Sequence, residues 1–190
     1  MRQESIYRIF SKFPTLETEW LTLRALRVSD APDMYDYSRR EDVTRYLLWN
    51  PHPDITHTRR YLEYLGGRYR LGMFYDWALV NKKDGRMIGS CGFVRFDLPH
   101  NSAELGYVLH PDYHGQGLMQ EAAGQVLKFG FEELGLHRIE ARFMVENEAS
   151  LRLMKRLGMT FEGVKRESML VKGAYRDIGT CAILKNEFKD

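Results

Sequence analysis

The fold is decided by residues 104–122, which read ELGYVLHPDYHGQGLMQEA. A short apolar strand ends here in a turn with glycines at 115 and 117, and a helix begins near Leu118. Glycine lets the backbone turn tightly and bring its N–H groups close to a ligand. The first N–H groups of a helix have no partner within the helix and carry partial positive charge. The stretch therefore predicts an anion site, and phosphate is the expected anion.

The glycine spacing matches neither of the two common nucleotide fingerprints. Gln120 stands where the G-x-G-x-x-G pattern requires a third glycine, and no Gly-Lys-Ser/Thr of a P-loop follows. We therefore expect the phosphates to belong to a ligand other than NAD or a Mg-bound triphosphate.

This segment resembles motif A of the GNAT acetyltransferases, whose turn holds the pyrophosphate of acetyl-CoA. Two further blocks resemble the branch of that family that acetylates the N-termini of ribosomal proteins. The first is Glu19-Trp20-Leu21-Thr22-Leu23-Arg24, which is similar to an entry strand but has Trp20 where Arg is typical. The second begins with Asn147-Glu148-Ala149-Ser150 and continues through Gly158-Met159 to Phe161-Glu162-Gly163. The resemblance covers about residues 16–186, in the same order throughout.

The resemblance implies the GNAT acyl-CoA N-acyltransferase fold, an α/β (α+β) architecture. We expect a mixed, mostly antiparallel central sheet of about seven strands with helices on both faces. Hairpin signals at Asp84-Gly85 and Lys172-Gly173, and apolar residues at helical spacing after Leu118, agree with this. A chain of 190 residues is long enough for one well-buried core. We expect an N-terminal arm over residues 1–15, where periodicity is weak, and a single domain over 16–190.

Composition excludes several classes of protein. Hydrophobic residues at 44% and charged residues at 28% are ordinary globular values, and a net charge of +2 is too small to indicate a DNA-binding protein. No apolar run approaches the roughly 20 residues of a transmembrane helix, and the N-terminus lacks the apolar stretch of a signal peptide. We expect a cytoplasmic protein with no membrane partner. Cys91 and Cys181 lie in apolar, strand-like segments and are predicted to be buried, reduced thiols.

The resemblance also implies acetyl-CoA as the cosubstrate. We expect no metal, because His110 and His114 lie on a loop interrupted by Gly and Pro, without the helix and Glu of a zincin. The residues that it implies in acetyl-CoA binding lie at the strand end, in the glycine turn and at the start of the later helix: Val108, Leu109, His114, Gly115, Gln116, Gly117, Leu118, Met119, Asn147 and Ser150.

Glu104 is the candidate general base. Acetyl transfer to an amine requires a neutral amine, stabilisation of the oxyanion and a proton for the departing thiolate. Glu104 lies on the strand that leads to the turn, matching a position where several GNAT enzymes carry a base. The alternative is a solvated charge on an exposed strand position.

Ser150 is the candidate proton donor or thiol anchor. The general GNAT pattern implies a Tyr four residues later, but Met154 stands there, which favours the ribosomal-type assignment of Ser150. The alternative is that Ser150 only belongs to the first turn of a helix. Asn147 has two roles open in the same way: a hydrogen bond to the pantetheine arm, or the N-cap of that helix.

Trp49 and Glu167 are the candidate substrate-binding residues. Trp49-Asn50-Pro51-His52 resembles the Trp-x-Pro-His loop of the ribosomal-type branch, where it would form a wall of the acceptor cleft; alternatively, Trp49 only anchors its loop. Members of that branch can carry a Glu base at the position of Met169. We expect Glu167, two residues earlier, to share the strand face of Met169 and to reach the same cleft.

The sequence thus predicts an acetyl-CoA-dependent N-acetyltransferase that works by direct attack in a ternary complex. The expected acceptor is an N-terminal α-amine of a protein or peptide. A small-molecule amine, such as an amino sugar, polyamine, amino acid or aminoglycoside, is the alternative acceptor. A second alternative, from another class, is a non-catalytic acyl-CoA sensor or ribosome-associated module, because a fold alone does not establish activity. Oligomeric state, including a homodimer, stays open.

Overall fold

One sheet of eight strands, in the order β1-β2-β3-β4-β5-β6-β8-β7, forms the centre of the computed structural model, which describes residues 3–189. The strands are β1 (Leu16–Glu17), β2 (Leu21–Arg24), β3 (Asp76–Asn81), β4 (Met87–Asp97), β5 (Ser102–Leu109), β6 (Arg138–Met144), β7 (Thr160–Val171) and β8 (Ala174–Leu184). The α-helices are α1 (Gln3–Phe10), α2 (Ala31–Ser38), α3 (Glu41–Thr44), α4 (Ile55–Arg70), α5 (Leu118–Glu132) and α6 (Glu148–Arg156). Two short 3-10 helices, η1 (Val28–Asp30) and η2 (Pro111–Tyr113), complete the fold.

The predicted class, a mixed and mostly antiparallel sheet with helices on both faces, is confirmed. Every neighbouring pair of strands is antiparallel except β5 and β6. The sheet has eight strands where about seven were expected. The two-residue strand β1 is too short to show an alternating pattern, so periodicity could not reveal it.

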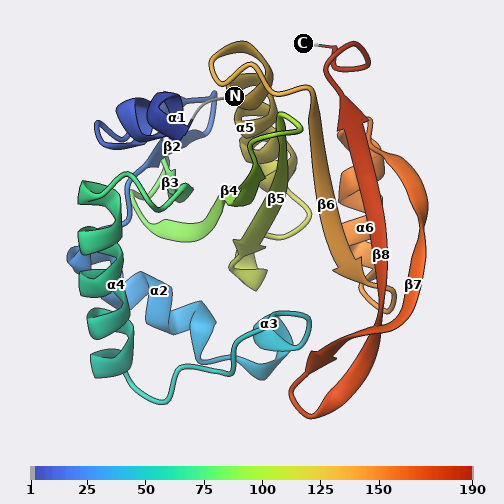
Figure 1. The fold of residues 1–190 in the computed structure, drawn as a ribbon. Helices are drawn as coiled ribbons and strands as arrows, with labels where there is room; N and C mark the ends of the chain where they lie inside the picture. Colours follow the sequence, from blue (N-terminus) through green and yellow to red (C-terminus); the bar gives the residue numbers. More distant parts are fainter. Residues whose placement is uncertain (1–2, 190) are drawn as a thin grey trace.

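The strands β5 and β6 separate half-way along their length. They pair from Ser102 opposite Arg138 to Leu105 opposite Ala141, although β5 continues to Leu109 and β6 to Met144. Figure 1 shows the two strands diverging toward their C-terminal ends. Beyond Leu105, β5 therefore has β4 on one edge and no strand on the other. An extended ligand can use the free backbone groups at such an edge.

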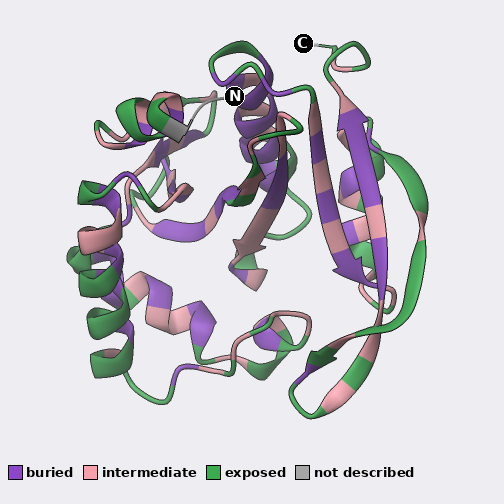
Figure 2. Ribbon diagram, in the orientation of Figure 1, coloured by how far each residue is buried: buried purple, intermediate pink, exposed green. Residues whose placement is uncertain are grey.

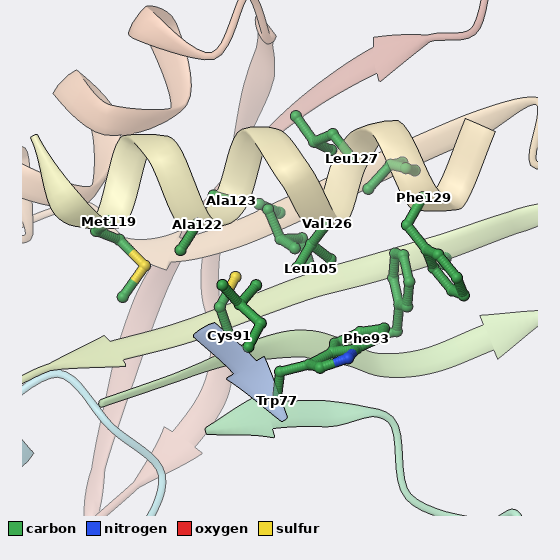
Figure 3. Close-up of a cluster of buried hydrophobic side chains, with 14 of the residues drawn as sticks. Trp77, Cys91, Phe93, Leu105, Met119, Ala122, Ala123, Val126, Leu127 and Phe129 are labelled. Carbon is green, nitrogen blue, oxygen red and sulfur yellow. The ribbon is translucent and has the colours of Figure 1, made fainter. Parts of the chain in front are cut away.

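The helix α5 covers one face of the sheet above the main hydrophobic core. Its buried side chains include Ala122, Val126 and Phe129, which face Trp77 and Leu105 on the strands below (Figure 3). This apolar stripe recurs at the spacing of one helix face. The packing fixes the helix, and with it the glycine turn that precedes Leu118.

The N-terminal arm expected over residues 1–15 contains a helix in its described part, residues 3–15. The helix α1 lies within it, and Ile6 and Phe10 are 3% and 0% exposed in the main core. The ring of Phe10 lies 4.9 Å from that of Tyr75 and 5.8 Å from that of Trp77. The expectation missed this helix because eight residues present only two buried apolar positions, too few for periodicity to stand out.

The helices α2 and α4 cover the opposite face. Tyr37 from α2 packs with Leu62, Leu65 and Tyr69 from α4 in a second cluster of buried residues, against Ala78 of β3. The β7–β8 hairpin is more open, and most of β7 is exposed (Figure 2). The prediction for the cysteines is confirmed, since Cys91 and Cys181 are both buried and unpaired. Within the described residues, no helix has both the length and the apolar character that a membrane crossing demands.

Candidate active site

The turn before α5 has the conformation that its two glycines predict. Gly115 has a φ of 75° and Gly117 a φ of 79°, both in the left-handed region. A Cβ at either position would meet no atom within 4 Å, so the backbone conformation, and not a lack of space, calls for glycine. Gly117 is also the N-cap of α5, and no side chain caps the helix there.

A run of backbone donors is left free at this turn. Among residues 3–189, the structure gives the N–H groups of residues 115–120 no acceptor. These consecutive donors lie at the positive end of a helix of 15 residues. Unpaired amides at a helix N-terminus are suited to the oxygens of a phosphate group. The turn therefore fits the pyrophosphate of acetyl-CoA.

Two side chains brace the turn from within. The imidazole Nε2 of His114 lies 3.1 Å from the carbonyl oxygen of Leu109, and the Gln116 amide donates to the carbonyl of Asp112 at 3.2 Å. These contacts hold the strand end and the turn together, so the free N–H groups stay aligned. Contact of the His114 and Gln116 side chains with acetyl-CoA stays a prediction.

Ser150 and Tyr107 meet where β5 and β6 separate. Tyr107 lies on β5 two residues beyond Leu105, the last residue paired with β6, and its Oη is 2.7 Å from Ser150 Oγ. Ser150 is 9% exposed, and burial raises the pKa of Tyr107 well above its usual value. Both hydroxyls are therefore neutral donors in a low-dielectric place. Sequence reasoning named Ser150 but missed Tyr107; its alternation with Leu105 on one strand face was the available signal.

Asn147 is the N-cap of α6. Its side-chain oxygen accepts from the N–H of Ser150 at 3.2 Å, which realises the capping alternative. The amide NH₂ of Asn147 has no partner among the described residues. It is therefore free to donate to a ligand, and the two roles considered for Asn147 are compatible.

Glu104 is held by two arginines. Its carboxylate accepts from Arg95 Nε at 2.8 Å and from Arg142 Nε at 2.7 Å, one bond to each oxygen. The Glu104 side chain is 8% exposed, so the solvated-charge alternative does not describe it either. Each carboxylate oxygen is therefore already occupied by a guanidinium donor. The role of Glu104 as a base stays a prediction, and these ion pairs argue against it.

Trp49 packs against His52 of its own loop. Its ring lies 5.3 Å from that of His52, and His52 is 8% exposed with Nδ1 2.8 Å from Thr58 Oγ1 on α4. The packing matches the alternative of a loop anchor. Contact of Trp49 with an acceptor stays a prediction.

A β-bulge in β7 separates Glu167 from Met169, which were expected to lie on one face of the strand. Between Lys165 opposite Ile178 and Met169 opposite Arg176, three residues of β7 face a single residue of β8. Glu167 lies in this bulge with a φ of 45°, exposed, and its N–H donates to Asp177 Oδ1 at 2.7 Å. The alternation of faces along a strand does not hold across a bulge. Alternation therefore gives no support for a shared face here, and contact of Glu167 with substrate stays a prediction.

A hollow of about 550 Å³ lies between α3, the loop that follows it and the tip of the β7–β8 hairpin. Its charged lining residues are Glu41, Asp42, Arg45 and Lys172. The ammonium of Lys172 donates to the carbonyl of Thr44 at 2.6 Å and ties the hairpin tip to α3. Figure 1 shows α3 and this hairpin side by side below the diverging ends of β5 and β6.

Comparison with known proteins identifies the family of this chain. Residues 21–160 match the family model described as an acetyltransferase (GNAT) domain. The chain belongs to the GNAT family. This GNAT protein is 32% identical over 174 residues to the "Uncharacterized N-acetyltransferase p20" of Bacillus licheniformis, which covers 92% of this chain and 98% of the relative. A solved acetyltransferase of the GNAT family from Bacillus anthracis matches with a TM-score of 0.82 at 27% identity, over 92% of this chain and 100% of that one.

Two relatives are named for different acceptors. The spermidine N(1)-acetyltransferase of Escherichia coli (strain K12) is 28% identical over 174 residues, which cover 87% of each chain. The ribosomal protein uS5 alanine N-acetyltransferase of the same strain is 28% identical over 172 residues, which cover 85% of this chain and 86% of the relative. This GNAT protein is therefore an acetyl-CoA-dependent N-acetyltransferase. The two relatives, named for different acceptors, are equally identical to it.

Proposed function

We propose that this GNAT protein acetylates an N-terminal α-amine of a protein or peptide. The charge of the hollow beside α3 carries the proposal. Its lining holds two acids, Glu41 and Asp42, and two bases, Arg45 and Lys172. Both oxygens of Asp42 also accept from Arg40, at 3.1 and 2.8 Å. A polyamine with several positive charges calls for an excess of carboxylates, which this lining lacks.

The chemistry of an α-amine suits the same site. An α-amino group has an unperturbed pKa near 8, so a useful fraction is neutral at physiological pH, whereas the side chain of lysine titrates near 10.4. The hollow is open and is lined by residues of α3, the loop after it and the hairpin tip, which suits a flexible chain end. The relative named for a ribosomal protein supports this class of acceptor, and the relative named for spermidine supports the alternative.

The proposed binding residues for acetyl-CoA follow from the free donors. The N–H groups of residues 115–120 take the pyrophosphate, and the Asn147 amide donates to the pantetheine arm along the free edge of β5, past Val108 and Leu109. Acetyl-CoA supplies an activated thioester. Ser150, with Tyr107 behind it, donates a hydrogen bond to the leaving sulfur at the point where β5 and β6 part.

A panel of acceptors tests the proposal. Purified protein is incubated with acetyl-CoA and either a peptide with a free N-terminus, the same peptide with a blocked N-terminus and one free lysine, or spermidine. Thiol release is followed, and mass spectrometry locates the acetyl group. We expect turnover only with the free N-terminus. Acetylation of spermidine or of the lysine peptide, with the free N-terminus left unmodified, would contradict the proposal.

A further inference from the structure

The carboxylate of Asp76 makes no hydrogen bond or ion pair with the described residues. Asp76 begins β3 and is partly buried. Its backbone carbonyl is engaged, since it accepts from Tyr69 Oη. Burial raises the pKa of the Asp76 carboxyl to about 7. A partly buried carboxylate without a partner is destabilising, so its place in the structure calls for an explanation.

The strand register leads from Asp76 to the proposed site of acetyl transfer. Asp76 lies opposite Gly92 on β4, and Gly92 lies opposite Gly106 on β5. Gly106 is the first residue of β5 beyond the last pair with β6, Leu105 with Ala141. Neighbouring strands are about 4.8 Å apart, so the Cα atoms of Asp76 and Gly106 are about 10 Å apart. The Asp76 carboxylate can therefore contact an amine bound above Gly92 and Gly106, either directly or through one water.

Gly92 and Gly106 have no side chains, so the sheet surface between Asp76 and the strand separation is bare backbone. A Cβ on Gly92 would lie 2.6 Å from Asp76 Oδ1 and 2.2 Å from the carbonyl oxygen of Tyr75. The carboxylate therefore rests on the bare backbone of Gly92. Above Gly106 the nearest atom is a methyl of Val94, a side chain that is 58% exposed and can move aside.

A second polar group beside Asp76 also lacks a partner. Tyr37, from α2, is 0% exposed, and its hydroxyl makes no hydrogen bond to a described residue. Burial raises the pKa of Tyr37, and the Asp76 charge raises it further. The same two causes raise the pKa of Tyr61 on α4, to about 12. Both phenols are therefore neutral near pH 7.

We propose that Asp76 receives the amine of the acceptor and takes up its proton, directly or through one water, in the role expected of Glu104. The inference rests on the proposed acetyl transfer to an amine. The ammonium group of the acceptor first gives one proton to the Asp76 carboxylate, which releases it to solvent. The neutral amine nitrogen then forms its bond to the acetyl carbon as the carbon–sulfur bond breaks, and the N–H proton lost in this step passes to the Asp76 carboxylate. The leaving sulfur takes its proton from the hydroxyl pair of Ser150 and Tyr107, which solvent then reprotonates.

The two pKa values are matched for this transfer. An α-ammonium group titrates near 8, close to the value of about 7 for Asp76, so proton transfer between them is nearly balanced. The titratable groups that interact electrostatically with Asp76 are Tyr37, Tyr61 and Tyr69 from the helices and the Cys91 thiol on the other face of the sheet, and the pKa of each is raised. We therefore expect an acid limb of the rate near pH 7 that depends on Asp76.

Rate profiles against pH test the inference. Wild type, Asp76→Asn, Glu104→Gln and the exposed-site control Asp97→Asn are compared with the best acceptor of the panel. We expect kcat/KM of the wild type to rise through about pH 7. Asp76→Asn should lose on the order of 10²–10⁴-fold, with a smaller loss at high pH and an unchanged Kd for acetyl-CoA. Wild-type rates and an intact acid limb in folded Asp76→Asn, with the limb lost in Glu104→Gln, would overturn the inference.

A binding measurement separates this inference from the proposed function. Glycinamide, a minimal α-amine, is titrated into CoA-saturated wild type while the amide NMR signals of Gly92 and Gly106 are followed. Both signals should shift in wild type and stay in place in Asp76→Asn. Silent signals in both proteins would refute a role for Asp76 even where another amine turns over. Turnover of spermidine alone, with its acid limb still lost in Asp76→Asn, would refute only the α-amine acceptor.

Discussion

The hydroxyls of Ser150 and Tyr107, 2.7 Å apart, bring together residues that are 43 positions apart in sequence. Either atom can be the donor, and the Ser150 backbone is fixed by its bond to the Asn147 side chain. The pair is therefore preorganised at the point where the strands separate. Asp76 and Glu104 differ in their ion pairs: the Glu104 carboxylate has two arginine partners, and the Asp76 carboxylate has none within residues 3–189.

Removal of either hydroxyl should affect turnover more than binding. Ser150→Ala should lower kcat on the order of 10²-fold with a smaller change in the acetyl-CoA KM, because the bond to sulfur strengthens as negative charge develops. Tyr107→Phe should act through Ser150, so the double variant should lose little more than Ser150→Ala alone. Steady-state kinetics of the four proteins measure this coupling. Unchanged turnover in Ser150→Ala would leave Ser150 a capping role only.

Asp76→Asn should stabilise the protein above neutral pH. The folded pKa of about 7 lies above the unfolded value near 3.9, so the charged carboxylate destabilises the fold above pH 7. This destabilisation fades as the pH falls from about 7 to 4, where the folded protein holds the proton. We expect the variant to gain on the order of 1–2 kcal/mol in free energy of unfolding at pH 8 and little at pH 5. Urea denaturation at both pH values measures this, and an equal difference at the two would contradict it.

Among the elements, α5 and the separated strands build the site together. The apolar face of α5 fixes the helix on the sheet, and the left-handed glycines aim the free N–H groups at one place. The helix α1 contributes from a distance, because Phe10 packs among Tyr75, Trp77 and Phe129 beneath α5. The N-terminal segment is thus part of the support of the catalytic face.

Loss of the Phe10 ring should therefore destabilise the whole domain. Phe10→Ala removes a fully buried aromatic side chain and should lower the free energy of unfolding by about 3–5 kcal/mol. Arg8→Ala, on the exposed side of the same helix, should change it by less than about 0.5 kcal/mol. Urea denaturation compares them. Similar stabilities for the two variants would mean that α1 is an accessory arm after all.

At the scale of the molecule, the sequence predicted the parts that depend on local chemistry. The glycine turn, the start of α5, the cap at Asn147 and the buried thiols all follow from residues adjacent in sequence. The ion pairs of Glu104 depend on strand register, which brings Arg95 and Arg142 beside it from two neighbouring strands. The bulge at Glu167 and the row from Asp76 to Gly106 also depend on register. The alternation of residues along one strand does not reveal which strands pair, in which register, or where a bulge occurs.

The central claim is that acetyl-CoA binds at the turn before α5, and calorimetry with Gly117→Glu tests it most directly. The variant places a negative charge and a strained φ of 79° at the proposed phosphate site. Gly135→Glu is the matched control, since Gly135 follows the far end of the same helix, has a φ of 65° and also has open space around a Cβ. We predict that the acetyl-CoA Kd rises at least about 100-fold, ~2.7 kcal/mol, in Gly117→Glu and stays at the wild-type value in Gly135→Glu. A folded Gly117→Glu protein with wild-type affinity would contradict the account.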